Sequence, residues 1–340
     1  MIDVLVVGGG PAGLATAINC AQAGLSVNVA EPRTGPIDKA CGEGLMPSAV
    51  TRLAAIGVRP DGHPLRGIRY LDSRHRADAP FRRGPGLGVR RTTLHAGLAA
   101  RAAELAIPVL PVRVAGFTQH NSGVTAAGIE ARYLVAADGL HSAIRRACAL
   151  DPTPARHPRF GLRRHYRLAP WSDLVEVYWA SGSEAYVTPV ADDLVGVAVL
   201  GGAQGGFESG LAAFPALRER LAGAAPASDV RGAGPLRQDV RRRVLGRVLF
   251  VGDASGYLDA LTGEGIGVAL AQATVLADCL AAGRASDYER AWQRVSRRAW
   301  ILTSGLLWSR HQALLAPRIV PAAQRLPNLF TSIVNEAAKA

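Results

Sequence analysis

The chain has 340 residues, of which 49% are hydrophobic and 19% are charged, and its formal net charge is +12. This length and composition indicate a soluble globular protein with a sizeable core, and they exclude a disordered or fibrous one. Arginine is spread along the whole chain without a basic tail, so the positive charge favours anionic ligands and argues against nucleic acid as a partner.

The chain begins with a short buried strand that runs into a glycine motif. Residues 2–7, IDVLVV, are a β-branched run typical of a strand buried on both faces. GGGPAG follows, and then small and apolar residues repeat with helical spacing until Gly24. Residues 26–31, SVNVAE, predict a second strand that ends in an acid. The first 31 residues therefore predict a β-turn-α-β unit.

The glycines of this unit have the spacing of a dinucleotide-binding loop. Gly8, Gly10 and Gly13 form GxGxxG, in which the first glycine allows a tight turn, the second admits a pyrophosphate and the third lets helix and strand approach. Glu31 stands at the end of the second strand, where a carboxylate accepts hydrogen bonds from an adenosine ribose. A carboxylate there disfavours a 2′-phosphate, so we expect FAD or NAD and not NADP.

The segment 38–47, DKACGEGLMP, has too many glycines for a regular helix or strand. If the first unit binds a flavin nucleotide, this loop crosses toward the flavin ring, and Gly42 and Gly44 let the backbone pass close to it. Cys41 then lies near the reactive edge of the flavin, where it shapes the cavity or assists proton delivery. We do not expect Cys41 to be a nucleophile. The alternative is a surface loop with an inert buried cysteine.

The middle of the chain alternates between helical and β-like patterns. Residues 67–88 are short and β-like, and residues 91–106 have one apolar helical face. Residues 109–117 and 123–139 predict strands. Alternating runs over 160–200 predict an antiparallel sheet with one exposed face. A strand (247–256), a helix (266–283) and a helical region from Tyr288 follow, with Pro317, Pro321 and Pro327 as breaks.

Two further glycine segments support FAD over NAD. Residues 134–146 contain D-G-x-x-S-x-x-R, formed by Asp138, Gly139, Ser142 and Arg145, and residues 248–273 contain Gly252-Asp253 followed by a glycine run. FAD has a ribitol chain that needs a carboxylate, and a flavin oxygen that suits a helix N-terminus. Asp253 and the turn at 263–267 supply these groups.

These motifs resemble those of FAD-dependent oxidoreductases of the aromatic-hydroxylase (group A flavin monooxygenase) and geranylgeranyl-reductase-like superfamily, over about residues 2–282. RRTTLH (90–95) is similar to that family's arginine-helix segment, which places an FAD contact on Arg91, or on Arg90 as substitute. The resemblance implies an α/β fold: a glutathione-reductase-like (Rossmann-type) FAD domain with an inserted antiparallel β substrate domain and a helical C-terminus. We expect a discontinuous FAD domain (1–65, 90–158 and 240–285), a substrate domain (66–89 and 159–239) and a C-terminal helical segment (286–340).

The motifs and the resemblance together assign the binding residues for noncovalent FAD. They are Gly8, Gly10, Pro11, Ala12, Gly13, Glu31, Pro32, Arg33, Cys41, Gly42, Arg91, Val114, Asp138, Gly139, Gly252, Asp253, Gly263, Glu264, Gly265 and Ile266.

The subgroup is indicated by KACGEGLMP and GDASGYLDALTGEGI, which are similar to geranylgeranyl-reductase-like members. SEAYVTPV (183–190) is similar to their strand that shapes a lipid cavity. The resemblance suggests Cys41 and Tyr186 as catalytic residues. It suggests as substrate contacts Met46, Tyr186, Thr188 and Pro189. Strand alternation puts Tyr186 and Thr188 on one face and Pro189 on the other, so we place the first two in the cavity.

Three functions are compatible with these features. The favoured one is a monooxygenase, a hydroxylase or epoxidase that acts through a flavin hydroperoxide on an apolar or aromatic small molecule, as in secondary metabolism. The second is a reductase of carbon–carbon double bonds in a prenyl or similar lipid. The third is a non-catalytic flavin-binding protein. In either enzyme, NADH or NADPH is the transient reductant and the cofactor performs the chemistry, so no catalytic triad is expected.

Localisation and partners follow from what the sequence lacks. Cys20, Cys41, Cys148 and Cys279 form no CxxC pair, so we expect a reducing cytoplasm and neither a zinc site nor a disulfide framework. The N-terminus lacks a basic region, so we expect no signal peptide, and no apolar run is long enough to span a bilayer. Residues 299–320 predict a helix packed on the FAD domain; the alternatives are an amphipathic cover over an apolar substrate tunnel, or a peripheral contact with a membrane surface or lipid.

Overall fold

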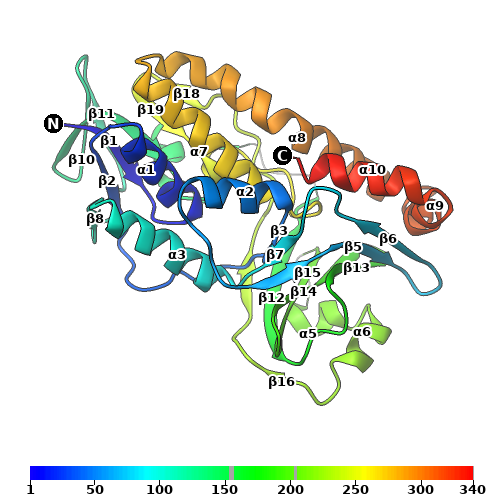
Figure 1. Cartoon of the computed structure of the whole chain (residues 1–340). Helices are drawn as coiled ribbons and strands as arrows, with labels where there is room; N and C mark the ends of the chain where they lie inside the picture. Colours follow the sequence, from blue (N-terminus) through cyan, green and yellow to red (C-terminus); the bar gives the residue numbers. More distant parts are fainter. Residues whose placement is uncertain (153–156, 203–204, 340) are drawn as a thin grey trace.

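The structure is a computed structural model that describes residues 1–152, 157–202 and 205–339 (Figure 1). Its first sheet has five parallel strands in the order β19-β11-β1-β2-β8, and these are Val248–Phe250, Ile129–Ala136, Ile2–Val7, Val27–Ala30 and Val109–Leu110. β18 (Val244–Leu245) adds an antiparallel edge, and β9 (Thr118–Gln119) and β10 (Val124–Ala126) form a hairpin on β11.

Both faces of this sheet are buried, as the β-branched run of the first strand predicts. Val4 and Val6 pack in a core with α1 (Pro11–Gln22), α3 (Arg91–Glu104) and α7 (Gly265–Ala281). Leu5 and Val7 face a second core that includes α4 (Ala143–Ala147). α8 (Tyr288–His311) packs against α7, and η1 (Gly252–Ser255) and η2 (Ala285–Asp287) are short 3₁₀ turns. The βαβ arrangement at the N-terminus is therefore the one that the sequence predicts.

The second sheet has the strand order β16-β12-β15-β14-β13-β5-β6, with β17 also on β12. These strands are β5 (Gly67–Leu71), β6 (Arg76–Pro80), β12 (Phe160–Arg167), β13 (Leu174–Ala180), β14 (Ser183–Ala191), β15 (Leu194–Gly201), β16 (Ala225–Pro226) and β17 (Arg231–Ala233). All neighbours are antiparallel except β13 and β5, which are parallel. The fold class that the sequence predicts is confirmed, and the residue limits of the domains stay a prediction.

One expectation for the second sheet is wrong: its central strands have no exposed face. Every residue of β15 is buried. One face of β14 and β15 packs on α5 (Gly206–Leu211) and α6 (Pro215–Arg220). The opposite face packs toward α8, α9 (Ile319–Arg325) and α10 (Pro327–Ala337), as Figure 1 shows. Elements distant in sequence cover both faces, which alternation within the strands does not reveal.

A third, small sheet joins the two larger ones. It consists of β3 (Gly44–Leu45), β7 (Gly86–Gly88) and β4 (His63–Leu65), and α2 (Pro47–Ala55) follows β3. At Gly88 an added Cβ would lie 1.7 Å from the Pro189 carbonyl oxygen, so β7 lies directly against β14. The loop that contains Cys41 leads into β3 and is thereby placed between the two large sheets.

Two local expectations differ from the structure. Residues 111–117 have no strand, because Pro111 interrupts the run after β8. Pro321 does not break the C-terminal region, since it lies in the first turn of α9, where no N–H donor is required. Pro317 lies in η3 (Ala316–Arg318) and Pro327 starts α10. No helix among the described residues is long and apolar enough to cross a membrane.

Candidate functional site

A large cavity of about 810 Å³ lies between the first and second sheets. It brings together residues that the sequence analysis selected from the first to the last third of the chain. Those that line it are Gly10, Pro11, Ala12, Arg33, Cys41, Gly42, Met46, Arg91, Asp138, Gly139, Tyr186, Thr188, Gly252, Asp253, Gly263, Gly265 and Ile266.

The glycine loop between β1 and α1 contains two kinds of glycine. Some are required by close packing against other protein atoms, and one borders open space in the cavity. Gly8 has φ +108°, and a Cβ on it would lie 2.5 Å from the Ala137 carbonyl oxygen. At Gly13 an added Cβ would lie 1.8 Å from the Gly8 carbonyl oxygen. At Gly10, which lines the cavity, the only atom of the described residues within 4 Å of an added Cβ would be Arg91 Nη2, at 3.8 Å. Protein packing thus explains Gly8 and Gly13, whereas the space beside Gly10 is free for a ligand.

The charge around that space suits an anion. Gly10 is the N-cap of α1 and has no side-chain cap, so the helix N-terminus is free to bind one. Arg33, Lys39 and Arg91 all line the same cavity. Burial lowers the pKa of Lys39, and the charges of Arg33 and Arg91 lower it further. Three converging cations beside an uncapped helix N-terminus fit the pyrophosphate of FAD.

Glu31 supports the glycine loop from behind the cavity. Its carboxylate accepts hydrogen bonds from the Gly9 N–H at 2.9 Å and from Arg33 Nε at 2.7 Å. Burial acts to raise the pKa of Glu31, but the bonds from Arg33 and Gly9 outweigh it and lower the pKa. The carboxylate is therefore charged and fixes Arg33 at the cavity wall. Its predicted bond to a ribose stays a prediction.

The DG and GD motifs lie next to each other at the cavity, and each contributes one carboxylate to its wall. Asp138 and Asp253 both line it. Asp138 Oδ2 accepts from the Ile144 N–H at 3.2 Å, and among the described residues its buried Oδ1 has no partner. Burial raises the pKa of Asp253, while Arg91, Lys39 and Arg145 act to lower it. Unsatisfied carboxylate oxygen at a cavity wall fits a hydroxyl-rich ligand such as the ribitol chain of FAD.

Sequence reasoning gave no individual role to three residues that hold this site. Arg145 is fully buried and donates to the Leu140 and Ala254 carbonyl oxygens, at 2.7 and 3.2 Å, so it ties the DG turn to the GD turn. His95 contacts the Gly9 carbonyl oxygen through Nε2 at 2.9 Å, and burial lowers the pKa of its ring. Lys39 is the third. The motif D-G-x-x-S-x-x-R and the RRTTLH segment contained signals for the first two, and Lys39 had none.

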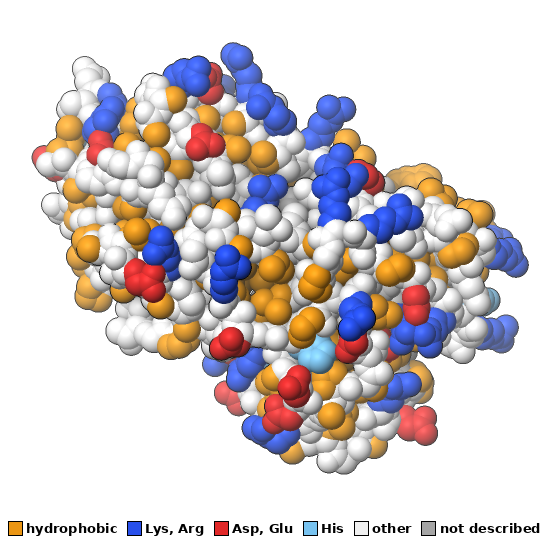
Figure 2. Space-filling model, in the orientation of Figure 1, with side chains coloured by type: hydrophobic (Ala, Val, Ile, Leu, Met, Phe, Trp, Pro, Cys, Tyr) orange, Lys and Arg blue, Asp and Glu red, His pale blue; other side chains and the backbone are white. Residues whose placement is uncertain are grey.

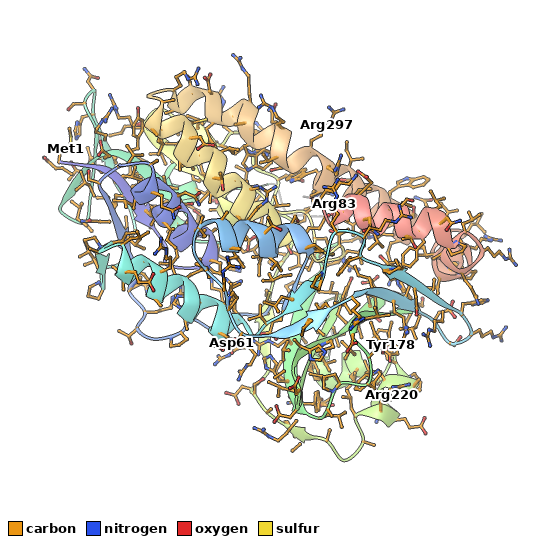
Figure 3. The ribbon with its side chains drawn as sticks, in the orientation of Figure 1. Met1, Asp61, Arg83, Tyr178, Arg220 and Arg297 are labelled. Atoms are coloured by element: carbon orange, nitrogen blue, oxygen red, sulfur yellow. The ribbon has the colours of Figure 1, made fainter. Side chains whose placement is uncertain are left out.

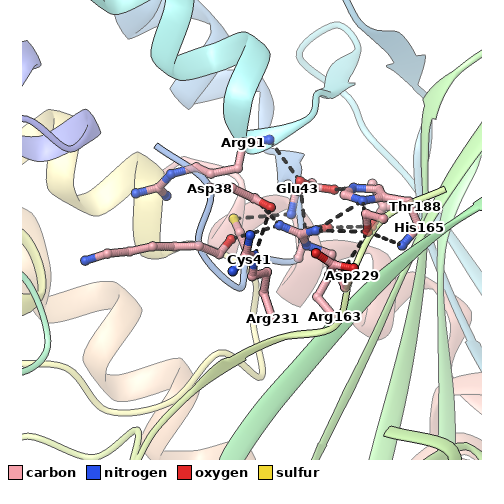
Figure 4. A network of polar contacts seen from close by, with 12 residues as sticks. Asp38, Cys41, Glu43, Arg91, Arg163, His165, Thr188, Asp229 and Arg231 are labelled. Atoms are coloured by element: carbon pink, nitrogen blue, oxygen red, sulfur yellow. Dashed lines mark hydrogen bonds and ion pairs between the residues drawn. The ribbon is translucent and has the colours of Figure 1, made fainter. Parts of the chain in front are cut away.

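The cysteine loop forms part of the cavity wall and is bonded to the second sheet (Figure 4), and its predicted position beside the flavin ring stays a prediction. Thr188 Oγ1 donates to the Gly42 carbonyl oxygen at 2.7 Å. Burial raises the pKa of the Cys41 thiol, and Sγ accepts from the Glu43 N–H at 3.4 Å. A protonated, hydrogen-bonded thiol fits the expectation that Cys41 is not a nucleophile.

Glu43 anchors this loop through a buried ionic network that the sequence did not reveal (Figure 4). Its side chain is 1% exposed, and Oε2 lies 2.6 Å from His165 Nε2. Oε1 accepts from the Arg91 N–H at 2.8 Å. Arg163, beside His165 on β12, pairs with Asp38 at the start of the loop. Glu43 has φ +60°, an unfavourable backbone conformation that this network holds in place.

The other end of the cavity is apolar. Tyr186 and Thr188 line it and Pro189 does not, as the alternation along the strand predicts. The Tyr186 hydroxyl donates to the Leu261 carbonyl oxygen at 2.8 Å, which fixes the ring. The apolar lining extends to α8, α9 and α10 through Leu302, Leu306, Ile319, Ala323, Leu326, Leu329, Phe330, Ile333 and Val334. The cavity therefore has a charged end and a long apolar end.

Some selected residues lie outside this cavity wall. Val114 is buried in the core on the other face of the first sheet, and Glu264 faces a separate small chamber. Gly8, Gly13, Glu31 and Pro32 stand behind the wall. Cofactor contacts of these residues stay predictions.

Comparison with known proteins relates this site to flavoenzymes. The FAD binding domain family matches residues 1–162. Digeranylgeranylglycerophospholipid reductase 2 of Methanothermobacter thermautotrophicus is 30% identical over 86% of this chain and 83% of its own length. The menaquinone reductase of Mycolicibacterium smegmatis is 28% identical over 98% and 90%. The 3-amino-4-hydroxybenzoate 2-monooxygenase of Streptomyces cremeus is 30% identical over 87% and 83%.

Solved structures share the fold. A flavin-dependent brominase superposes with a TM-score of 0.86 at 18% identity and covers 100% of this chain and 94% of its own. A geranylgeranyl bacteriochlorophyll reductase-like protein of Thermoplasma acidophilum superposes with a TM-score of 0.78 at 20% identity over 99% and 94%. These likenesses show the architecture, on which reductases and halogenases both occur.

Proposed function

We propose a reaction for this protein from one premise: the chain belongs to the family of FAD-dependent oxidoreductases that carry this FAD binding domain. The proposed reaction is the reduction of a carbon–carbon double bond in an apolar, lipid-like substrate. Bound FAD supplies two-electron redox chemistry. NADH or NADPH is the proposed source of electrons.

The single observation that supports a lipid over a small aromatic ring is the length of the apolar end of the cavity. Its wall runs from Tyr186 and Met46, beside the cysteine loop, to Leu326, between α9 and α10, and to Leu329 and Ile333 on α10. The last three side chains line the cavity and are also exposed to solvent. A chain-like molecule would thus be able to lie with one end beside the cysteine loop and the other at the protein surface. This favours reduction, although sequence analysis favoured oxygenation.

In the proposed reaction, the side chains of the protein bind the cofactor, orient the substrate and exclude water. Arg33, Lys39 and Arg91 would hold the pyrophosphate and Asp253 the ribitol hydroxyls. Tyr186, fixed by its bond to the Leu261 carbonyl oxygen, would orient the substrate end beside Cys41 and Gly42. The largely apolar cavity wall would keep water from the reacting carbons.

The test compares products with and without oxygen. The purified protein is incubated with NADH or NADPH, or with dithionite, and with a menaquinone or a digeranylgeranylglycerophospholipid as trial substrate. A product that gains two hydrogen atoms per double bond in anaerobic mass spectrometry supports reduction. Unchanged lipids under all three reductants contradict it.

Oxygenation is the second candidate, because a monooxygenase is among the relatives that match at 30% identity. The same assay in air separates the two. A product that gains one oxygen atom, together with oxygen uptake that depends on the substrate, would favour this candidate over reduction.

We also propose that the lipid reaches the cavity from a bilayer, through a patch formed by exposed side chains of the C-terminal helices. Its members are Ile301, Trp308, Leu314, Leu315, Leu326, Leu329 and Ile333, which are 37–75% exposed. Figure 2 shows hydrophobic side chains at this end of the molecule with basic side chains among them. Figure 3 labels Arg83, which lies beside α10, and Arg297, which belongs to α8. Apolar residues rimmed by arginine favour the surface of an anionic membrane.

Vesicle binding tests this surface. The protein should sediment with vesicles that contain anionic phospholipid, and the double variant Trp308→Ser, Leu314→Ser should do so much less. Neither residue lines the cavity, so activity on detergent-dispersed substrate should be kept. Equal sedimentation of parent and variant would contradict the placement. The proposed localisation is the cytoplasm, at the membrane surface.

A further inference from the structure

Glu264 is a buried acid that the site described above does not use. It lies between the glycine turn and α7, and only 4% of the residue is exposed. Among the described residues neither carboxyl oxygen has a hydrogen-bond partner of normal geometry, although the Thr262 side chain lies near enough to act on the pKa of the acid. Glu264 is the N-cap residue of the 17-residue helix α7, yet its side chain does not cap the helix. A buried carboxyl group in this situation is costly unless it is neutral or bonded to water.

The acid faces a small chamber of about 50 Å³. Thr262, Thr303 and Gln272 also line this chamber, and the Thr262 and Thr303 hydroxyls lie 2.9 Å apart. A chamber of this volume with several polar groups has room for one or more water molecules. Water bound in this chamber would form hydrogen bonds with the carboxyl oxygens of Glu264.

The chamber adjoins the main cavity. Six residues line both spaces: Gly252, Asp253, Tyr257, Thr262, Gly265 and Ala269. They include the GD motif, whose carboxylate faces the charged end of the main cavity. Glu264 is thus separated from the reaction space by a single layer of residues, two of which carry hydroxyl groups.

We propose that Glu264 and the water in its chamber form an internal proton store for the reaction in the main cavity. The inference rests on the proposed reduction, which adds two electrons and two protons to a double bond. The reductant supplies a hydride, that is, the electron pair together with one of the protons, and the acid supplies the other proton. The O–H bond of the Glu264 carboxyl breaks, its proton passes over water to the reacting carbon, and the carboxylate left behind regains a proton from bulk water before the next turnover.

Electrostatics around the acid keep it protonated at neutral pH. Burial raises the pKa of Glu264 to about 8, against smaller lowering effects of Thr262 and Arg298. The other titratable groups that face the chamber are Asp253, Tyr257 and Asp259. Asp259 is paired with Arg159 at 2.9 Å, and burial raises the pKa of Asp253 and of Tyr257. An acid with a pKa close to the working pH is suited to give and regain a proton.

The first test does not depend on substrate. Infrared spectra of the protein without substrate should show the carbonyl band of a protonated buried carboxyl, which disappears with a midpoint near pH 8. Glu264→Gln should lack this band. Glu104→Gln, which changes an exposed acid paired with Arg101, should keep it. Absence of the band in the parent, or its persistence in Glu264→Gln, would overturn the inference.

The second test uses turnover. Product formation by Glu264→Gln, measured at a saturating concentration of FAD, should fall by about 10²-fold or more, the usual contribution of a positioned acid. The loss of rate above pH 8 in the parent should be absent from the variant. Parental rates and pH profile in Glu264→Gln would refute the proton store. If the parent reduces no lipid, the proposed reaction fails, and the infrared result still decides whether Glu264 is a protonated acid.

Discussion

Because there is open space beside Gly10, a substitution at this residue should affect cofactor binding without affecting folding. Gly10 has φ −73° and ψ 176°, which any residue adopts, and an added Cβ would have no neighbour closer than Arg91 Nη2 at 3.8 Å. Gly10→Ala should therefore leave the fold intact. It should even stabilise the protein without FAD by up to about 1 kcal/mol, because alanine has less conformational freedom in the unfolded chain.

The methyl group that Gly10→Ala adds would occupy the space that a pyrophosphate needs. Displacing the phosphate from one or two backbone N–H groups removes charge-assisted hydrogen bonds of about 1.5–3 kcal/mol each. Since about 1.4 kcal/mol corresponds to a tenfold change in affinity, FAD binding should weaken by roughly tenfold for one bond at the lower end of this range and by about 10⁴-fold for two bonds at its upper end. Gly10→Val should weaken it further.

Two measurements on the same preparations check this. Urea unfolding of the FAD-free protein gives the stability, and quenching of flavin fluorescence on titration gives the dissociation constant. Gly13→Ala is the matched control, because its Cβ would lie 1.8 Å from the Gly8 carbonyl oxygen and should disrupt the fold itself. Unchanged FAD affinity in Gly10→Ala, or a clear loss of stability without FAD, would refute the reasoning.

Four further predictions follow from individual side chains. Asp253→Ala should weaken FAD binding by about 1.5–3 kcal/mol per lost ribitol bond, measured by the same titration; equal affinity would contradict the role. Cys41→Ser should retain FAD and alter turnover or product distribution, and no change in either would make the thiol an inert buried group. Glu43→Ala should destabilise the protein by about 3–5 kcal/mol in urea unfolding, since it leaves buried His165 and Arg163 without their shared acid; a stable variant would show that the network does not hold the loop. Glu264 keeps a proton in the folded state that the unfolded chain releases above about pH 4.5, so its contribution to stability falls by about 1.4 kcal/mol per pH unit up to about pH 8. The stability of Glu264→Gln relative to the parent should rise by that slope between about pH 5.5 and 7.5, and a constant difference would argue against a protonated acid.

The nucleotide-binding half of the site was predictable because its signals are local. The β1–α1–β2 unit lies within about thirty consecutive residues, and the steric reasons for Gly8 and Gly13 act between neighbouring segments of that unit and the adjoining strand. The DG and GD motifs each combine a strand end with a turn, so their residues are recognisable without their partners. Their order along the chain was sufficient to predict FAD.

The failed expectation for the second sheet and the missed network around Glu43 depend on segments far apart in the sequence. The exposed face expected for the second sheet is covered by α5 and α6 on one side and by the C-terminal helices on the other. Glu43 and His165 are 122 positions apart, and their 2.6 Å contact has no local pattern.

Glu264 illustrates the same division within one motif. The sequence places it in a glycine turn before a helix, where a carboxyl group would normally be solvated and charged. In the folded protein α8 packs Trp300 and Thr303 over the turn. This packing shields the acid from bulk solvent, and the loss of solvation raises its pKa. The sequence by itself determined which segments bind the nucleotide, because backbone geometry and strand-turn-helix order are encoded locally. The tertiary structure decided which side chains share a cavity and which are desolvated, because both depend on contacts between distant parts of the chain.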